Sequence, residues 1–325
     1  MNTLQRKDAK TQGRKAIAPS VSLSLCASVL IILLAAALRF HNLSAQSLWN
    51  DEGNAYVQAT RNFADIASNA ARDIHPPGYY WLLAVWHDLA GSSEVALRAF
   101  STLASILSVA FTFAIGKRLF NPVAGLAAAM LVALNTFSIY YAQEARMYAL
   151  LALWASAGMW ALVQLVASYK SQARGLPKAY LHSSRFRWGL VLALINAAGL
   201  YTQYAYPFIM LAQGVIFLLW LIFNFTFRAQ RATPLQDITG GINPAPTLGT
   251  RYSILINYVA SNLLTILLFL PWLPTALRQV TQWPSTGTPI PAAEALGIIG
   301  GWFTLGVTYE FVPNAVNYLP FALLI

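Results

Sequence analysis

The sequence predicts an all-α protein that crosses a membrane several times. Hydrophobic residues make up 57% of the 325-residue chain and charged residues only 10%, whereas charged residues make up about a quarter of soluble globular domains. The mean hydropathy is +0.53. A chain in lipid must satisfy its backbone polar groups internally, which favours helices. Several apolar runs also reach the length of roughly 20 residues that a helix needs to cross a bilayer.

Seven apolar runs are long enough to be membrane spans. They are residues 21–40, 95–119, 123–141, 147–168, 188–204, 206–227 and 254–273. An eighth run, 78–90, is shorter and ends in His87 and Asp88, so we expect an interfacial helix there instead of a crossing. The first run is predicted to be an uncleaved anchor, because it is long and is followed by Leu38-Arg39-Phe40. A cleaved signal peptide is the alternative.

The distribution of cations predicts the orientation. With these spans, fifteen of the 21 Lys and Arg residues fall on one side of the membrane, which the positive-inside rule assigns to the cytoplasm together with the N-terminus. Eight of the 11 acidic residues fall on the opposite side. The net charge of +10 therefore reflects membrane topology. Nucleic-acid binding, which needs cations gathered on one face beside exposed aromatic rings, is not expected.

The predicted organisation is a basic cytoplasmic tail over residues 1–20 and a transmembrane domain over residues 21–325. Residues 41–94 form a long first outer loop, and residues 169–187 and 228–251 form cytoplasmic loops. The sequence ends in an apolar run that begins near Val316, so we expect the C-terminal part of the protein to be missing. Cys26 is the only cysteine, so no intrachain disulfide can form.

The first outer loop contains two amphipathic stretches. In the first, Tyr56, Phe63 and Ile66 recur at helical spacing, as expected for a helix lying in the membrane interface. The second is the aromatic-rich segment 78–90, which follows Pro76-Pro77. These two juxtamembrane helices are predicted to roof an outward-facing cavity.

Adjacent carboxylates stand at the start of this loop, in Leu48-Trp49-Asn50-Asp51-Glu52-Gly53. Asn50 or Asp51 could simply cap a helix, because either side chain accepts hydrogen bonds from free backbone N–H groups. The functional interpretation makes Asp51 a general base that takes a proton from an attacking hydroxyl. The sequence leaves both interpretations open.

His75 lies at a rigid corner before Pro76 and Pro77. A histidine before proline can be a simple turn residue. It could also be a metal ligand if it converged with Asp51 or Glu52, but no fixed spacing between these residues requires that.

A third polar cluster lies at an outer junction between two spans, within residues 140–148. Tyr140, Glu144 and Tyr148 are four residues apart and would share one face of a helix. Arg146 would point elsewhere unless the helix breaks at the junction. An ordinary polar turn with a local ion pair is the alternative, but ionisable residues at a membrane boundary are functional candidates, and an arginine fork suits a phosphate.

Tyr201-Thr202-Gln203-Tyr204 form a fourth outer junction, which is uncharged and rich in rings and hydroxyls. Such residues can anchor a protein at the membrane interface. They could also stack on the faces of a sugar.

Together, in this order, the clusters resemble membrane glycosyltransferases of the GT-C fold, in the family related to protein O-mannosyltransferases and lipid A aminoarabinose transferases. The resemblance lies in LWNDEG, HPPGYYWLL, RAFSTLASILSVAFTFAIGKRLF and YYAQEARMYAL, over about residues 40–155. It implies a GT-C-like helical bundle whose first outer loop carries juxtamembrane helices. It also implies transfer of a sugar from a polyprenyl-phosphate-linked donor to a hydroxyl of a lipid, glycan or protein acceptor at the outer face of the plasma (inner) membrane.

The resemblance also implies roles for individual residues. Asp51 would be the general base, with Glu52 beside it. The donor phosphate site would contain His75, Glu144, Arg146 and Tyr148. Tyr79, Tyr201, Gln203 and Tyr204 would be sugar or acceptor contacts. Relatives often have His where this chain has Gln203, so a metal or proton role of that His is not implied here. Glu52 and His75 could hold a divalent metal, and no other cofactor is implied.

The alternative from another functional class is a transporter or flippase of lipid-linked sugars. Such proteins usually place ionisable groups near the membrane midplane and are built from repeated halves. The predicted spans are nearly free of charge and no internal repeat is apparent. The sequence therefore favours the enzyme.

Overall fold

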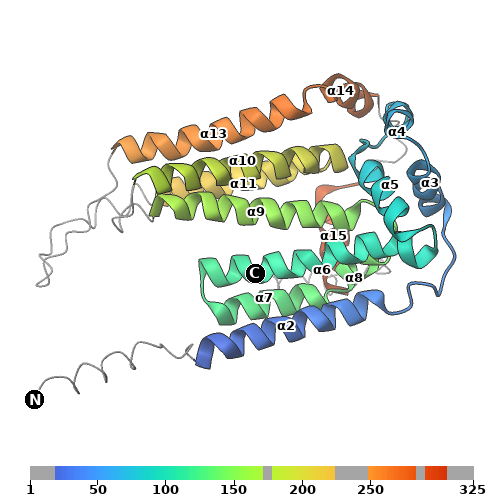
Figure 1. Ribbon diagram of the computed structural model, residues 1–325, viewed down its shortest axis with the longest axis horizontal. Helices are drawn as coiled ribbons and strands as arrows, with labels where there is room; N and C mark the ends of the chain where they lie inside the picture. Colours follow the sequence, from blue (N-terminus) through green and yellow to red (C-terminus); the bar gives the residue numbers. More distant parts are fainter. Residues whose placement is uncertain (1–18, 171–177, 224–247, 283–289, 306–325) are drawn as a thin grey trace, which may run out of the picture.

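A computed structural model describes residues 19–170, 178–223, 248–282 and 290–305 (Figure 1). These residues form thirteen helices and no strand, which confirms the predicted all-α fold. The predicted N-terminal tail, most of the 228–251 loop and the apolar run near Val316 lie outside the described residues.

Seven long helices lie side by side and form the body of the molecule (Figure 1). They are α2 (Pro19–Phe40), α6 (Glu94–Leu119), α7 (Pro122–Leu134), α9 (Tyr148–Lys170), α10 (Lys178–Thr202), α11 (Tyr206–Ile222) and α13 (Leu248–Phe269). Helices α2, α6 and α7 pack against one another, and α6 also contacts α9. Helix α10 lies between α9 and α13, and α11 contacts both α9 and α10.

Four short helices gather at one end of this bundle, drawn at the right of Figure 1. They are α3 (Asn50–Ala59), α4 (Phe63–Ala70), α5 (Gly78–Ala90) and α14 (Leu273–Thr281). We refer to this end as the short-helix end. Two further helices, α8 (Thr136–Ala142) and α15 (Ala292–Leu305), contact each other.

The described helices are those of an integral membrane protein. Four are long and apolar enough to cross a bilayer, namely Leu23–Phe40, Glu94–Leu119, Tyr148–Tyr169 and Tyr252–Phe269. Helices α7 and α8 would make a fifth span if they act as one, although they are bent by 60°. Each of the seven predicted spans overlaps one helix or, for α7 and α8, a bent pair.

Some predicted boundaries are wrong. The predicted span 123–141 is broken at Asn135, whose side chain accepts a hydrogen bond from the Ser138 N–H at 2.8 Å and so starts α8. The single amphipathic helix predicted around Tyr56 to Ile66 is two helices, because Asn62 caps α4 in the same way. Helix α10 begins at Lys178, inside the predicted 169–187 loop, and α13 ends at Phe269 instead of residue 273. Helices α14 and α15 were not predicted.

A buried arginine stabilises the bend between α7 and α8. Arg39, at the end of α2, is fully buried and donates to the carbonyl oxygens of Val132 and Ala133, both at 2.9 Å. It also donates to Ser105 Oγ at 2.8 Å and Ser138 Oγ at 3.0 Å. The bend leaves carbonyl groups near the end of α7 without helical partners, and Arg39 supplies donors for two of them.

A close backbone contact fixes the start of α5. A Cβ atom on Gly78 would lie 2.6 Å from the carbonyl oxygen of Tyr201, at the end of α10. Only glycine allows the two backbones to approach this closely. The segment that follows His75 and the two prolines is therefore held against the α10–α11 junction.

Candidate active site

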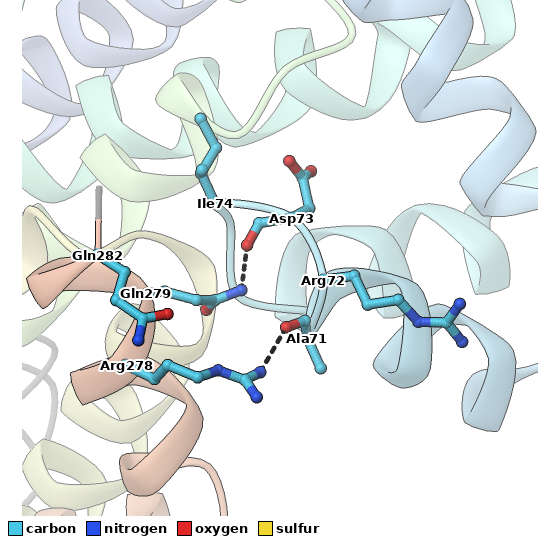
Figure 2. A pocket seen from close by; sticks show the side chains of 7 residues that line it. All are labelled: Ala71, Arg72, Asp73, Ile74, Arg278, Gln279 and Gln282. Carbon is cyan, nitrogen blue, oxygen red and sulfur yellow. Dashed lines mark hydrogen bonds between the residues drawn. The ribbon is translucent and has the colours of Figure 1, made fainter. Parts of the chain in front are cut away.

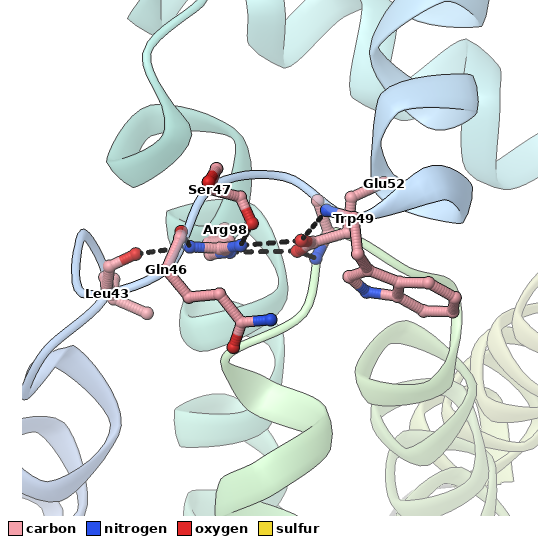
Figure 3. A network of polar contacts seen from close by, with 7 residues as sticks. Leu43, Gln46, Ser47, Trp49, Glu52 and Arg98 are labelled. Atoms are coloured by element: carbon pink, nitrogen blue, oxygen red, sulfur yellow. Dashed lines mark hydrogen bonds and ion pairs between the residues drawn. The ribbon is translucent and has the colours of Figure 1, made fainter.

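Glu52 and Arg98 form a buried ion pair that holds the short-helix end together (Figure 3). Arg98 Nε donates to Glu52 Oε1 at 2.9 Å, and Arg98 Nη2 donates to Glu52 Oε2 at 2.6 Å. The Ala145 N–H also donates to Glu52 Oε1, at 2.8 Å. Glu52 is fully buried. One carboxylate therefore joins α3, α6 and the loop between α8 and α9.

Arg98 also organises the chain that leads into α3. Its Nη1 donates to the carbonyl oxygens of Leu43 and Gln46, both at 2.7 Å, and its Nη2 donates to Ser47 O at 3.3 Å. Burial alone would raise the pKa of Glu52, but the hydrogen bonds from Arg98 and from the Ala145 backbone bring the pKa below its ordinary value. Glu52 is therefore an ionised carboxylate, and both of its oxygens accept hydrogen bonds.

Asp51 lies in a different environment from its neighbour. Its side chain is 40% exposed, and its Oδ2 lies 3.2 Å from Nη2 of the buried Arg146. Arg146 Nη1 also approaches the Asp51 carbonyl oxygen at 3.5 Å. Trp49 occupies the N-cap position of α3, and its backbone N–H donates to the Glu52 carboxylate at 3.4 Å. The capping role considered for Asn50 or Asp51 is therefore not observed.

The loop between α8 and α9 turns Arg146 toward Asp51. Helix α8 ends at Ala142 and α9 begins at Tyr148. The helix is therefore broken at Arg146, which was the condition for its side chain to point toward the site. The Arg146 Cζ atom lies 5.9 Å from the centre of the Tyr148 ring. Burial raises the pKa of Glu144, and its hydrogen bond with Tyr140 offsets only part of this effect. The predicted residues Asp51, Arg146 and Tyr148 are thus brought together, with Glu144 in the same loop.

His75 pairs with Asp73. The His75 Nδ1 and Asp73 Oδ2 atoms are 3.6 Å apart. Interaction with His75 lowers the pKa of Asp73, against the effect of burial, and the positive charge of Arg146 lowers it further. Asp73 thus interacts electrostatically with both His75 and Arg146.

The residues considered as metal ligands do not converge. Glu52 is paired with Arg98 and His75 with Asp73. Among the residues that the structure describes, no group of three or more His, Cys, Asp or Glu side chains could hold a metal ion. A metal site built on Glu52 and His75 therefore has no support in this geometry.

The predicted sugar contacts lie elsewhere or are buried. Tyr79 is fully buried, so a sugar cannot reach it in this structure. Tyr204 hydrogen-bonds Gln279 of α14 and accepts from Trp272 Nε1 at 2.9 Å. The Tyr201 hydroxyl donates to Leu268 O at 3.3 Å, and Gln203 Oε1 accepts from the Tyr204 N–H at 2.8 Å. Tyr201 and Tyr204 thus connect the α10–α11 junction to α13 and α14, whereas the hydrogen bond of Gln203 lies within the junction.

A cavity of about 430 Å³ lies between the end of α4 and α14, and Asp73 is one of the residues that line it (Figure 2). Gln279 donates to Ala70 O at 2.6 Å and also to the carbonyl oxygen of Asp73, and Arg278 donates to Ala71 O at 2.7 Å. Figure 2 shows the side chain of Arg72 pointing away from Arg278. The cavity therefore adjoins the polar cluster, but its two guanidinium groups do not converge.

Three residues near the site were missed by the sequence analysis, namely Arg98, Asp73 and Tyr80. Arg98 is a cation near the start of an otherwise apolar run, which is a signal that could have drawn attention to it. Tyr80 is almost fully buried and interacts electrostatically with Arg146, Asp73 and Asp51. No local pattern indicates this position.

Comparison with known proteins supports the family expected from the sequence. Residues 74–232 match the family described as dolichyl-phosphate-mannose-protein mannosyltransferase. The chain has no significant match among curated protein sequences.

Two solved structures share the fold. The S. cerevisiae protein O-mannosyltransferase Pmt1-Pmt2 complex, bound to the sugar donor, has a TM-score of 0.56 and 15% identity, over 82% of this chain and 35% of the yeast chain. The oligosaccharyltransferase AglB from Archaeoglobus fulgidus, in complex with an inhibitory peptide and a dolichol-phosphate, has a TM-score of 0.55 and 14% identity, over 94% of this chain and 36% of the archaeal chain. This chain thus spans about a third of each relative's length. The predicted resemblance to GT-C-fold glycosyltransferases of the protein O-mannosyltransferase type is confirmed.

Proposed function

We propose that this chain, with the GT-C glycosyltransferase fold of the protein O-mannosyltransferase type, transfers a sugar from a polyprenyl-phosphate-linked donor to an acceptor hydroxyl, with Asp51 as the general base. The observation that carries the proposal is the pair formed by the partly exposed Asp51 and the buried Arg146. A lipid-linked donor is supported by the related structures, which hold a sugar donor in one case and a dolichol-phosphate in the other.

The chemistry of the transfer needs both members of this pair. When the sugar leaves, a polyprenyl phosphate anion forms, and a cation placed beside it stabilises that charge in the transition state. The acceptor hydroxyl must lose a proton as its oxygen attacks the anomeric carbon, and a carboxylate can take it. Arg146 suits the first role, since its planar fork matches phosphate oxygens. Asp51 suits the second.

Binding of the donor would also release the base. In the structure, Arg146 Nη2 lies 3.2 Å from Asp51 Oδ2. A donor phosphate would compete for the same guanidinium and free the carboxylate to face the acceptor. Glu52 remains buried against Arg98 in this mechanism and positions the helix that carries Asp51. This assignment differs from the expectation that Glu52 shares the catalytic role.

The reaction would take place at the outer face of the membrane. The cation asymmetry of the sequence favours the cytoplasm for the opposite end of the bundle. The site lies at the short-helix end, beside apolar helices, where a lipid-borne donor could reach it from the bilayer. His75, Glu144 and Tyr148 would complete the surroundings of the phosphate.

The test uses the purified full chain in lipid nanodiscs with polyprenyl-phosphate donors carrying a radiolabelled hexose or pentose. We expect the parental protein to turn over one of these donors into a labelled acceptor product. Arg146→Ala should reduce donor use at least tenfold, and Arg146→Lys should restore only part of it, since a point charge replaces a bidentate fork. Full donor use by Arg146→Ala would contradict the proposal. Movement of intact donor across a vesicle bilayer without turnover would favour a flippase instead.

A further inference from the structure

Four buried polar atoms at residues of the site have no hydrogen-bond partner in the structure, namely His75 Nδ1, the hydroxyl oxygens of Tyr79 and Tyr80, and Arg146 Nε. Tyr80 is 1% exposed and Arg146 is 4% exposed. Buried polar groups in proteins are almost always hydrogen-bonded, because they have lost their hydrogen bonds to water. The Tyr80 hydroxyl and Arg146 Nε are both donors in one polar cluster, and they therefore indicate that a ligand with acceptor atoms belongs there.

The two residues come from separate elements that pack together. Tyr80 lies on α5 and belongs to the same buried cluster as Ala145, Met147 and Leu150, which flank Arg146 in the sequence. Tyr80 also interacts electrostatically with Arg146, Asp73 and Asp51. Its phenol therefore lies within electrostatic reach of these charged groups.

The chemical state of Tyr80 suits a hydrogen-bond donor. Burial raises the pKa of Tyr80 to about 12, so the phenol keeps its proton at neutral pH. Asp51, Asp73 and Glu144 already supply acidic groups around Arg146. A neutral phenol can bind an anion there without adding negative charge.

We propose that the Tyr80 hydroxyl donates a hydrogen bond to a phosphate oxygen of the lipid-linked donor while Arg146 binds the same phosphate. This inference rests on the proposed function and adds a substrate-binding residue to it. Phosphate is the ligand because it offers several acceptor oxygens and a negative charge to one guanidinium and one phenol. The phosphate could be the lipid-borne group or free inorganic phosphate, so the experiment must separate these two sources.

Tyr79 provides a matched control within the same helix. It is fully buried beside Tyr80, with ring centres 5.5 Å apart. Its ring also packs near Phe100, at 6.0 Å, and its hydroxyl lies near Ser101 of α6 without forming a hydrogen bond of ordinary geometry. Replacing either tyrosine with phenylalanine removes one buried hydroxyl and keeps the ring, so the two changes are sterically equivalent.

The experiment measures binding of polyprenyl phosphate to the purified full chain in nanodiscs. The variants are Tyr80→Phe, Tyr79→Phe and Arg146→Ala, and the further probes are inorganic phosphate and the matching polyprenol. A hydrogen bond to a charged group corresponds to roughly a tenfold change in Kd or more. We expect Tyr80→Phe to raise the Kd for polyprenyl phosphate about tenfold and Tyr79→Phe to change it less than about threefold. Binding of polyprenol should be weaker than that of polyprenyl phosphate in the parent and equal in all variants.

The outcomes separate this inference from the proposed function. If Arg146→Ala weakens binding but Tyr80→Phe binds like the parent, the role of Tyr80 is wrong and the proposed function stands. If neither variant weakens binding, the phosphate site itself is wrong. Equal losses in Tyr79→Phe and Tyr80→Phe would show a general effect on the core and contradict the inference. Inorganic phosphate binding as tightly as the lipid would contradict the lipid-linked source. Since each change removes a hydroxyl that has no hydrogen-bond partner in the structure, the two variants should have similar melting temperatures.

Discussion

Asp51 and Glu52 are neighbours with the same functional group, yet their side chains lie in different environments. Successive side chains on an α-helix point about 100° apart. Glu52 therefore enters the interior and meets Arg98, whereas Asp51 lies at the surface and meets Arg146. The side chain of Glu52 is 1% exposed and that of Asp51 is 40% exposed. Only Asp51 is accessible to an acceptor.

This difference predicts unequal effects of two matched substitutions on stability. Glu52→Gln should lower the free energy of unfolding by about 3 kcal/mol, because it leaves the Arg98 charge buried without a counterion. Asp51→Asn should change the free energy of unfolding by less than about 1 kcal/mol, because the Asp51 side chain is 40% exposed and the Arg146 charge still interacts with Asp73 and Glu144. Denaturation of both variants in the same detergent measures the difference. Equal losses of stability would contradict the separate roles of the two carboxylates.

Among the helices, the site depends on where α8 and α10 end and where α5 begins. Helix α8 ends at the loop that presents Arg146, and its direction is set by the bend at Asn135 and by the hydrogen bonds of Arg39. Helix α5 carries Tyr80 and starts against the end of α10 at Gly78. A change at either place should therefore move site residues that it does not touch.

Gly78→Ala tests the contact between α5 and α10. The added Cβ would meet the Tyr201 carbonyl oxygen at 2.6 Å, so α5 must shift or the fold must lose stability. We expect a loss of about 1–3 kcal/mol, the usual range for overpacking. Gly53→Ala is the matched control, because its Cβ would have nothing within 4 Å and alanine is the better helix former. Thermal unfolding measures both, and a Gly78→Ala protein as stable as Gly53→Ala would show that the contact is not close.

At the scale of the whole molecule, the sequence predicts the helices better than the contacts between them. The all-α class and the positions of the long helices follow from apolar runs and charge, which are local properties. The pairing of Arg98 with Glu52 joins residues 46 positions apart, and no local pattern encodes it. The pairing of Asp51 with Arg146 was not predicted, and the sequence indicated only that the direction of Arg146 depends on a helix break at the junction.

The orientation of the molecule is tested by reporter fusions. The cation asymmetry predicts that reporters placed after Lys117-Arg118, or within residues 170–187, read cytoplasmic. A reporter at Gly91, between α5 and α6, should read external. An external signal within residues 170–187 would reverse the orientation and place the site on the cytoplasmic face.

The transfer rate of Asp51→Asn tests whether Asp51 is the base of a sugar transfer. The amide keeps the size of the side chain but has no useful proton affinity near neutral pH. Loss of a general base typically costs roughly a hundredfold to ten-thousandfold in rate. We predict a loss in this range for purified Asp51→Asn, with polyprenyl phosphate still bound and the melting temperature close to that of the parent. Transfer from a polyprenyl-phosphate-linked donor at near-parental rate would contradict the account.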